Sequence, residues 1–151
     1  MKQWENFDDV LDFAIANEVK ATFFYEDLAR KVENSNLQEL FRSFAKEEEG
    51  HAAKLRKIKA GEREMGAFKE IPDLKIADYV VEADEDETLD YQGALILAMK
   101  REKSAFKLYT DLANAAGDAD LKRIFAGLAQ EEAKHKLRFE LEYDQYVLGE
   151  N

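Results

Sequence analysis

The sequence contains an internal duplication. The segment NEVKATFFYEDLA, near the N-terminus, aligns without a gap with REKSAFKLYTDLA, which lies 84 positions later. The same offset carries Glu48 onto Glu132 and His51 onto His135, and these are the only 2 histidines in the chain. A repeat of this length predicts two structurally equivalent halves. The fold therefore has to accommodate two copies of one substructure.

Each half is predicted to form two helices. Asn6 and Asp90 are equivalent N-cap candidates at the start of the first helix of each half. Ser35 with Gln38 has the spacing of a capping box for the second helix, and Gly117 is the expected stop of the third. The loops between paired helices, ENSN and AAGDAD, are short. Short loops predict antiparallel neighbours.

Composition favours a single all-α domain. The chain has 151 residues, 46% hydrophobic content, 36% charged residues, 7 glycines and 1 proline, which suits long helices and provides few hairpin turns. This length is enough for one hydrophobic core and short for two. We expect one domain over residues 1–151, with helix pairs at about 7–59 and 91–146.

A long crossover, about residues 60–90, separates the two predicted pairs. It contains Pro72 and the acidic run EADEDE, but also the apolar residues of IPDLKIADYVV, which are sufficient to lie against a bundle. Two antiparallel pairs joined by one long crossover form the arrangement of ferritin-like four-helix bundles.

The predicted buried stripe of each helix contains glutamate. Core positions of a bundle helix advance by alternating steps of four and three residues. On the second and fourth helices this progression passes through a glutamate and a histidine at equivalent places, and on the first and third through one glutamate flanked by alanines. The six polar stripe residues are Glu18, Glu48, His51, Glu102, Glu132 and His135.

Four carboxylates in a core need a counter-charge. Each buried, ionised and unpaired glutamate would cost several kcal/mol. No lysine occupies these stripes, and the absence of cysteine leaves only oxygen and imidazole as ligands. Four carboxylates with two neutral imidazoles carry a charge of about −4, which two divalent ions would cancel. The stripes therefore predict a dinuclear carboxylate metal site.

The stripe also separates neighbouring candidates. Glu47 and Glu131 lie four residues before the histidines but fall off the four-three progression, whereas Glu48 and Glu132 fall on it. We therefore expect Glu48 and Glu132 to be the ligands. Glu47 and Glu131 are expected to be solvated or to contact the ligands from outside.

Tyr25 and Tyr109 occupy equivalent stripe positions two turns beyond Glu18 and Glu102. A core aromatic residue whose hydroxyl finds a partner explains them at least as well as a redox role. Their hydroxyls are also candidates to hydrogen-bond a ligating carboxylate from outside the ligand set.

The net charge of −11 argues against nucleic acid or an anionic membrane as a partner. The N-terminus MKQWENFDDV lacks the apolar core of a signal peptide, and the longest unbroken apolar run, ALILAM, is far shorter than a membrane span. We expect a cytoplasmic protein.

With these motifs, the chain resembles the rubrerythrin-type diiron proteins of the ferritin-like superfamily. The resemblance covers nearly the whole chain and is carried by NEVKATFFYEDLA, FAKEEEGHAAKL, AMKREKSAFKLY and LAQEEAKHKL. It implies two iron ions held by the six stripe residues, with two of the glutamates bridging, although zinc or manganese would also suit such ligands. It further implies reaction with hydrogen peroxide or dioxygen, and a homodimer.

The chain departs from the family pattern in two ways. It has no cysteine and hence no rubredoxin module, so electrons have to come from a separate, rubredoxin-like donor protein. The additional glutamate found one turn from the third-helix ligand is also missing, because Met99, Ala105 and Phe106 stand around Glu102. We expect a diiron-carboxylate oxidoreductase. The alternatives are an iron-binding, ferroxidase-like protein without peroxidase turnover, and a helical interaction module with a vestigial or zinc-filled site.

Overall fold

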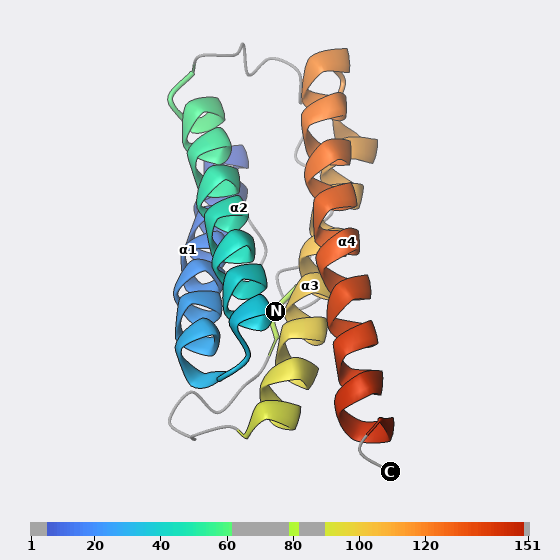
Figure 1. The fold of residues 1–151 in the computed structure, drawn as a ribbon. Coiled ribbons are helices and arrows are strands. Elements are labelled where there is room, and N and C mark those ends of the chain that lie inside the picture. Colours follow the sequence, from blue (N-terminus) through green and yellow to red (C-terminus); the bar gives the residue numbers. More distant parts are fainter. Residues whose placement is uncertain (1–5, 62–78, 82–89, 150–151) are drawn as a thin grey trace. The chain divides into compact units, whose positions relative to one another are not determined.

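A computed structural model describes residues 6–61, 79–81 and 90–149. The helices in these residues are α1 (Phe7–Lys31), α2 (Ser35–Lys59), α3 (Tyr91–Ala115) and α4 (Ala119–Leu148). They pack as two pairs, α1 with α2 and α3 with α4 (Figure 1). The chain divides into two compact units that correspond to these pairs, and each unit is described by itself. The predicted all-α class with two helix pairs is confirmed, while a single domain over 1–151 stays a prediction.

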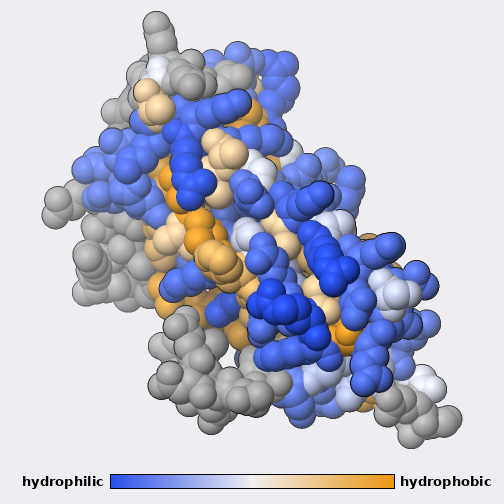
Figure 2. Space-filling model, turned by 60° about the vertical axis from the view of Figure 1, so that its left-hand side comes forward, coloured by the Kyte–Doolittle hydropathy of each residue, from blue (hydrophilic) through white to orange (hydrophobic). Residues whose placement is uncertain are grey.

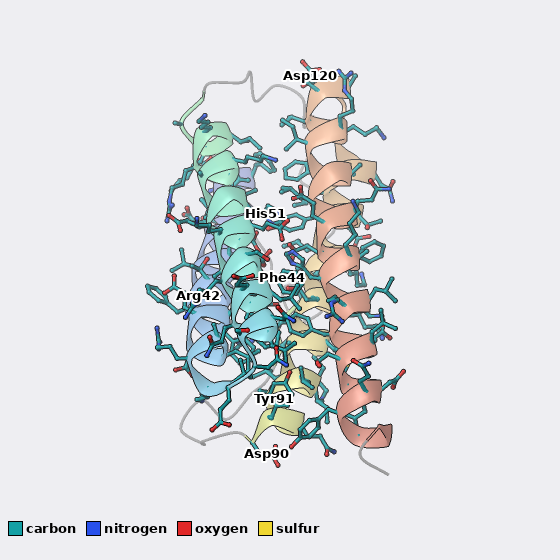
Figure 3. The ribbon with its side chains drawn as sticks, in the orientation of Figure 1. Arg42, Phe44, His51, Asp90, Tyr91 and Asp120 are labelled. Carbon is teal, nitrogen blue, oxygen red and sulfur yellow. The ribbon has the colours of Figure 1, made fainter. Side chains whose placement is uncertain are left out.

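Both pairs are antiparallel. The connections within them span only residues 32–34 and 116–118, which forces each chain segment to reverse direction at once. In the second pair, Asp90 and Tyr91 at the start of α3 lie at the opposite end from Asp120 at the start of α4 (Figure 3). Within each pair, residues far apart in sequence thus lie side by side.

Three helices begin as the side-chain chemistry of their first residues dictates. Asn6 Oδ1 accepts a hydrogen bond from the backbone N–H of Asp9 at 2.9 Å, and Asp90 Oδ1 accepts one from Gly93 at 2.7 Å. Both N-caps are confirmed. At the start of α4, the Asp118 carboxylate accepts a bond of 3.2 Å from the N–H of Leu121. Each cap satisfies an N–H group that the helix itself leaves without a partner.

The capping box predicted at Ser35 is wrong. The N-cap of α2 is Asn34, whose Oδ1 accepts from the N–H groups of Asn36 and Leu37 at 2.9 and 3.1 Å. Gln38 does not reach back to Ser35, because its side-chain amide donates instead to the Val32 carbonyl at 2.8 Å. Asparagine caps as well as serine does, and the helix begins one residue earlier than expected.

The core of the α1·α2 pair follows the predicted stripes. Its fully or nearly fully buried apolar residues recur at steps of three and four, and each large one stabilises the fold by roughly 1.5–3 kcal/mol. The ring of Tyr25 meets that of Phe44 edge-on, with centroids 6.1 Å apart. The buried stripe residues are Leu11, Ala14, Ala21, Tyr25 and Leu28 of α1 with Phe41, Phe44, Leu55 and Ile58 of α2, while Phe7, Val32 and Leu37 are half-buried.

The α3·α4 pair repeats this pattern. Tyr109 stacks on Phe125 with centroids 6.4 Å apart and an interplanar angle of 14°. The predicted stripes are again buried along most of their length. The buried apolar residues on them are Leu95, Ala98, Tyr109 and Leu112 of α3 with Leu121, Phe125, Leu128 and Phe139 of α4, while Tyr91 and Ala105 are half-buried.

One residue of the predicted crossover is anchored on α3. Tyr79 is 2% exposed, its hydroxyl donates to Asp111 Oδ2 at 2.7 Å, and its carbonyl accepts from Ser104 Oγ at 2.6 Å. The Nζ atom of Lys107 lies 5.0 Å from the ring centroid. At this residue the crossover packs on a helix, as expected. Most of the remaining crossover, including Pro72 and EADEDE, lies outside the described residues.

The surface is largely polar. On the face drawn in Figure 2, hydrophilic side chains predominate among the coloured residues, and hydrophobic atoms are exposed in patches between them. None of the helices in residues 6–61 and 90–149 combines the length and the apolar character needed to cross a bilayer.

Candidate metal centre

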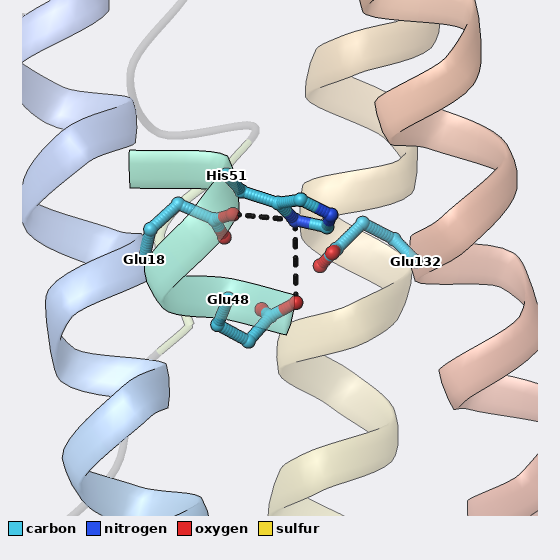
Figure 4. A group of neighbouring side chains, drawn as sticks. All are labelled: Glu18, Glu48, His51 and Glu132. Atoms are coloured by element: carbon cyan, nitrogen blue, oxygen red, sulfur yellow. Dashed lines mark ion pairs between the residues drawn. The ribbon is translucent and has the colours of Figure 1, made fainter. Parts of the chain in front are cut away.

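The α1·α2 pair brings two carboxylates and one imidazole together. The Nδ1 atom of His51 lies 2.7 Å from Glu18 Oε2 and 3.3 Å from Glu48 Oε1 (Figure 4). One ligand atom from each residue lies within 4.8 Å of those of the other two. Glu48 and His51 share a helix face because they are three residues apart, and α1 supplies Glu18 from across the pair. We call these residues the first triad.

The α3·α4 pair contains the equivalent second triad, Glu102, Glu132 and His135. Its ligand atoms also lie within 4.8 Å of one another. The Nδ1 atom of His135 is 3.6 Å from Glu102 Oε1. All six residues singled out from the sequence are thus assembled, three in each pair. Their role as metal ligands stays a prediction.

Both triads are buried, so their carboxylates require a compensating positive charge or a proton. The four glutamates are 1–2% exposed and the two histidines 2–3%. An ionised carboxylate that leaves water for such surroundings requires a positive partner or a proton. Each triad concentrates up to two negative charges around one imidazole, which is the charge distribution that a cation would neutralise.

The pKa of His51 reflects this need for positive charge. Burial by itself lowers the pKa of His51, but the hydrogen bonds that the ring donates to the carboxylates of Glu18 and Glu48, together with the charge of these groups, raise it to about 10. In metal-free protein at neutral pH the His51 ring is therefore protonated on both nitrogens and positively charged. A metal ion would replace that proton, because imidazole binds metals only in its neutral form.

The donor set of each triad fits a divalent transition metal. Two carboxylates and an imidazole suit iron, manganese or zinc, and the absence of cysteine excludes thiolate sites. The buried positions of the stripe also contain alanine beside the glutamates, since Ala14 and Ala98 are 0% exposed and Ala21 is 7% exposed. The side chains beside the glutamates on these stripes are therefore small.

Adjacent acids are separated as the stripe predicts. Glu47 and Glu49 are exposed and Glu131 is half-buried, whereas Glu48 and Glu132 are each 1% exposed. Helical phase thus distinguishes side chains that are one residue apart.

Tyr25 and Tyr109 are each 1% exposed. Their rings pack against the core phenylalanines of their own pairs, as described above. That they hydrogen-bond ligating carboxylates stays a prediction.

The sequence analysis missed two buried polar residues. Thr22 is 8% exposed, and its hydroxyl donates to the carbonyl of Glu18 at 2.9 Å, one turn back along α1. Glu142, also 8% exposed, lies on α4 outside either triad. The signal for Glu142 was present, since the four-three progression that ends at Phe139 reaches it with one more step of three.

A protein-family model matches the part of the chain that contains both triads. The model for rubrerythrin matches residues 9–143, which include both triads. The chain belongs to the rubrerythrin family. In a rubrerythrin-family chain, two buried Glu–Glu–His clusters are consistent with a dinuclear carboxylate metal site.

A solved structure is similar to this chain in sequence and in fold. A hypothetical protein from Pyrococcus furiosus is similar over 93% of this chain and 90% of its own, with 28% sequence identity and a TM-score of 0.73. Among curated proteins, no significant match is found. The all-α, ferritin-like fold class predicted from the sequence is therefore confirmed.

Proposed function

We propose that the two triads together hold two iron ions and that the chain is an oxidoreductase that reduces hydrogen peroxide or dioxygen. The observation that carries this proposal is the burial of two equivalent Glu–Glu–His triads in a rubrerythrin-family chain. In this proposal the six residues of the two triads together supply the ligands of a dinuclear site. Four carboxylates and two neutral imidazoles then balance two divalent ions.

Reduction of one hydrogen peroxide to two water molecules consumes two electrons and two protons. Bound iron would supply the redox chemistry and act as a Lewis acid. The chain itself contributes carboxylates and imidazoles in a water-poor core. Because it has no cysteine, the two electrons are proposed to come from a separate, rubredoxin-like donor protein.

The proposal can be tested with iron-loaded protein that has been reduced without air. One equivalent of hydrogen peroxide should oxidise it much faster than dissolved air does, as followed by stopped-flow absorbance. Oxidation no faster than in air, or oxidation that does not depend on iron, would overturn the assignment to peroxide.

A matched pair of variants tests the ligand set. Glu48→Gln removes a buried carboxylate and should abolish binding of the second iron, whereas Glu47→Gln changes an exposed neighbour and should leave about two iron ions per chain. Iron content by elemental analysis decides the matter. Equal losses in both variants would mean that the stripe does not define the ligands.

A second function, Fe(II) oxidation or holding without peroxidase turnover, is favoured by the surroundings of Glu102. Met99 and Ala105, one turn away on either side, are half-buried, and Phe106 is 40% exposed, where the family places an additional glutamate. Repeated addition of Fe(II) in air separates the two. Uptake well beyond two iron ions per chain favours storage, and saturation at two counts against it.

A further inference from the structure

The α3·α4 pair buries polar atoms at a second place, away from its triad. Outside the two triads, the described residues contain two buried side-chain oxygens without a hydrogen-bond partner, Oη of Tyr91 and Oε2 of Glu142. Glu142 is 8% exposed, and Tyr91 is half-buried. A buried polar atom without a partner destabilises a fold, and in native proteins such atoms are usually satisfied by water or by a ligand.

The two oxygens belong to one cluster at the start of α3. Tyr91 is the first residue of α3 (Figure 3), and its ring meets that of Tyr146 in α4 edge-on, with centroids 4.9 Å apart. Tyr146 lies one turn after Glu142 on the same face of α4. Burial and the nearby charge of Glu142 both raise the pKa of the Tyr91 hydroxyl. We call Tyr91, Glu142 and Tyr146 the tyrosine–glutamate cluster.

This cluster is separate from the second triad. Glu142 follows Glu132 by ten residues, which is about 15 Å along the helix axis. Tyr91 precedes Glu102 by eleven residues, or about 16 Å. A metal ion held by the triad would therefore not satisfy the two oxygens of the cluster.

The duplication provides an internal comparison. The residues 84 positions before Tyr91 and Glu142 are Phe7 and Ile58. Ile58 is 2% exposed and Phe7 is half-buried, so the α1·α2 pair packs at this place with apolar side chains. A helix pair of this kind does not need an acid or a hydroxyl there. The polar groups of the cluster therefore indicate binding rather than packing.

The carboxylate of Glu142 lacks a compensating charge at close range. Burial raises the pKa of Glu142, and the opposing charge of Arg138, one turn earlier on α4, does not cancel this effect. Within the part of the chain that the structure describes, Arg138 forms no ion pair. A water molecule could hydrogen-bond to both oxygens, but only a cation would offset the cost of burying the ionised carboxylate.

We propose that the tyrosine–glutamate cluster binds a primary ammonium group, carried by a small amine or by a lysine side chain. An ammonium group has three N–H donors, so it can donate to Oε2 of Glu142 and to Oη of Tyr91. The tyrosine rings add the attraction between a cation and an aromatic face.

The chemistry of the cluster favours this class of ligand over two others. A calcium or magnesium ion requires about six oxygen ligands, whereas the cluster offers one carboxylate and phenol oxygens. An anion would be repelled by Glu142 and by the chain as a whole, whose net charge is −11. Since the cluster lies apart from both triads, the proposal does not depend on the proposed function.

Isothermal titration calorimetry of the full chain with n-butylammonium chloride tests the proposal, with sodium chloride adjusted to keep the ionic strength constant. One ion should bind per chain with a dissociation constant on the order of 1 mM, because few contacts hold so small a ligand. Glu142→Gln should weaken binding at least about 10-fold, and Tyr91→Phe about 3- to 10-fold. The matched control Glu140→Gln, which removes a half-buried acid two residues away, should bind as the unmodified chain does.

A further variant separates loss of the site from loss of the fold. Glu142→Ile introduces the residue that α2 has at the equivalent position, so it should retain the helical circular dichroism spectrum and the cooperative unfolding of the unmodified chain. It should nevertheless show no saturable binding. Binding that persists in Glu142→Ile overturns the proposal.

Control ligands define the remaining outcomes. The absence of saturable binding to the unmodified chain would mean that water alone satisfies the two oxygens, and it overturns the proposal. Equal binding of potassium chloride, or binding of sodium acetate in place of the amine, overturns it as well, because the site then selects for something other than an ammonium group.

A second amine distinguishes the two sources of the ammonium group. Nα-acetyl-lysine N-methylamide carries the same group on a segment of polypeptide backbone. Tighter binding of this compound than of n-butylammonium supports a lysine side chain as the ligand. Weaker binding supports a small free amine.

Discussion

At the residue scale, one position along a helix decides whether an acid is buried. Glu48 is 1% exposed, whereas its neighbours Glu47 and Glu49 are exposed. Nothing in composition distinguishes these three side chains. The helix turns by about 100° per residue, and this rotation directs only Glu48 to the core stripe.

Gly50, between Glu48 and His51, has no packing role that the structure reveals. It is exposed in mid-helix, and a Cβ built there meets nothing within 4 Å. Gly50→Ala should therefore raise the free energy of unfolding by about 0.5–1 kcal/mol, measured by urea denaturation of metal-free protein. Gly127→Ala in α4, which is equally open, provides the matched control. A loss of stability at position 50 alone would point to a need for glycine there.

Glu142 predicts a pH dependence. Burial raises the pKa of Glu142, and the opposing charge of Arg138 does not offset it. A carboxyl group whose pKa is higher in the folded than in the unfolded state favours folding most at low pH, below the unfolded pKa of about 4.3. This contribution to stability is lost as the pH rises through the folded pKa. Glu142→Gln, which is always neutral, should therefore stabilise the protein more at pH 8 than at pH 5.

Thermal unfolding at the two pH values measures this difference. The control is Glu140→Gln, two residues away, which removes only a partly exposed pair with Lys136. If Glu142→Gln raises the unfolding temperature by the same amount at both pH values, ionisation of Glu142 is not the cause of the increase.

At the element scale, local chemistry made most of the fold predictable. The caps Asn6 and Asp90 and the four core stripes depend on residues close in sequence. The start of α2 was missed by one residue because Asn34 and Ser35 are both good caps, and only the hydrogen bonds distinguish them. The contacts of Tyr79 with Asp111 and Ser104 join residues 25–32 positions apart, which no local pattern reveals.

The cap of α2 can be tested directly. Asn34→Ala should lower the free energy of unfolding by about 1 kcal/mol, because two N–H groups lose their acceptor. Ser35→Ala should change it by less than half of that, measured in the same urea titration. If Ser35→Ala is the more harmful substitution, the helix starts at the serine cap in solution.

At the scale of the whole molecule, duplication made the ligand candidates predictable. One Glu-x-x-His motif is weak evidence, but its equivalent 84 residues later, with a glutamate on the preceding helix of each half, specifies both triads. Which metal, electron donor and oxidant would serve the proposed function depends on molecules outside the chain, so its residues alone do not determine them.

If both triads together hold one dinuclear site, removing a metal-ligating side chain from one helix pair should weaken the protection that bound iron gives to the other pair. Iron at about 100 times its dissociation constant stabilises a protein by about 2.7 kcal/mol. Amides of α2 should therefore exchange more slowly with deuterium when iron is bound, and Glu102→Gln in α3 should reduce this protection. The control Glu131→Gln should retain it. Protection of α2 that is unchanged by Glu102→Gln would mean that the pairs bind metal separately.

The side chains that begin the helices also bear on chemical ageing. Every helix in the described residues starts with asparagine or aspartate: Asn6, Asn34, Asp90 and Asp118. Hydrolysis of the Asn34 amide would keep the oxygen that caps α2 and add a negative charge beside the positive end of the helix dipole. Deamidation of Asn6 or Asn34 to aspartate would therefore leave the helix that it caps at least as well capped as before.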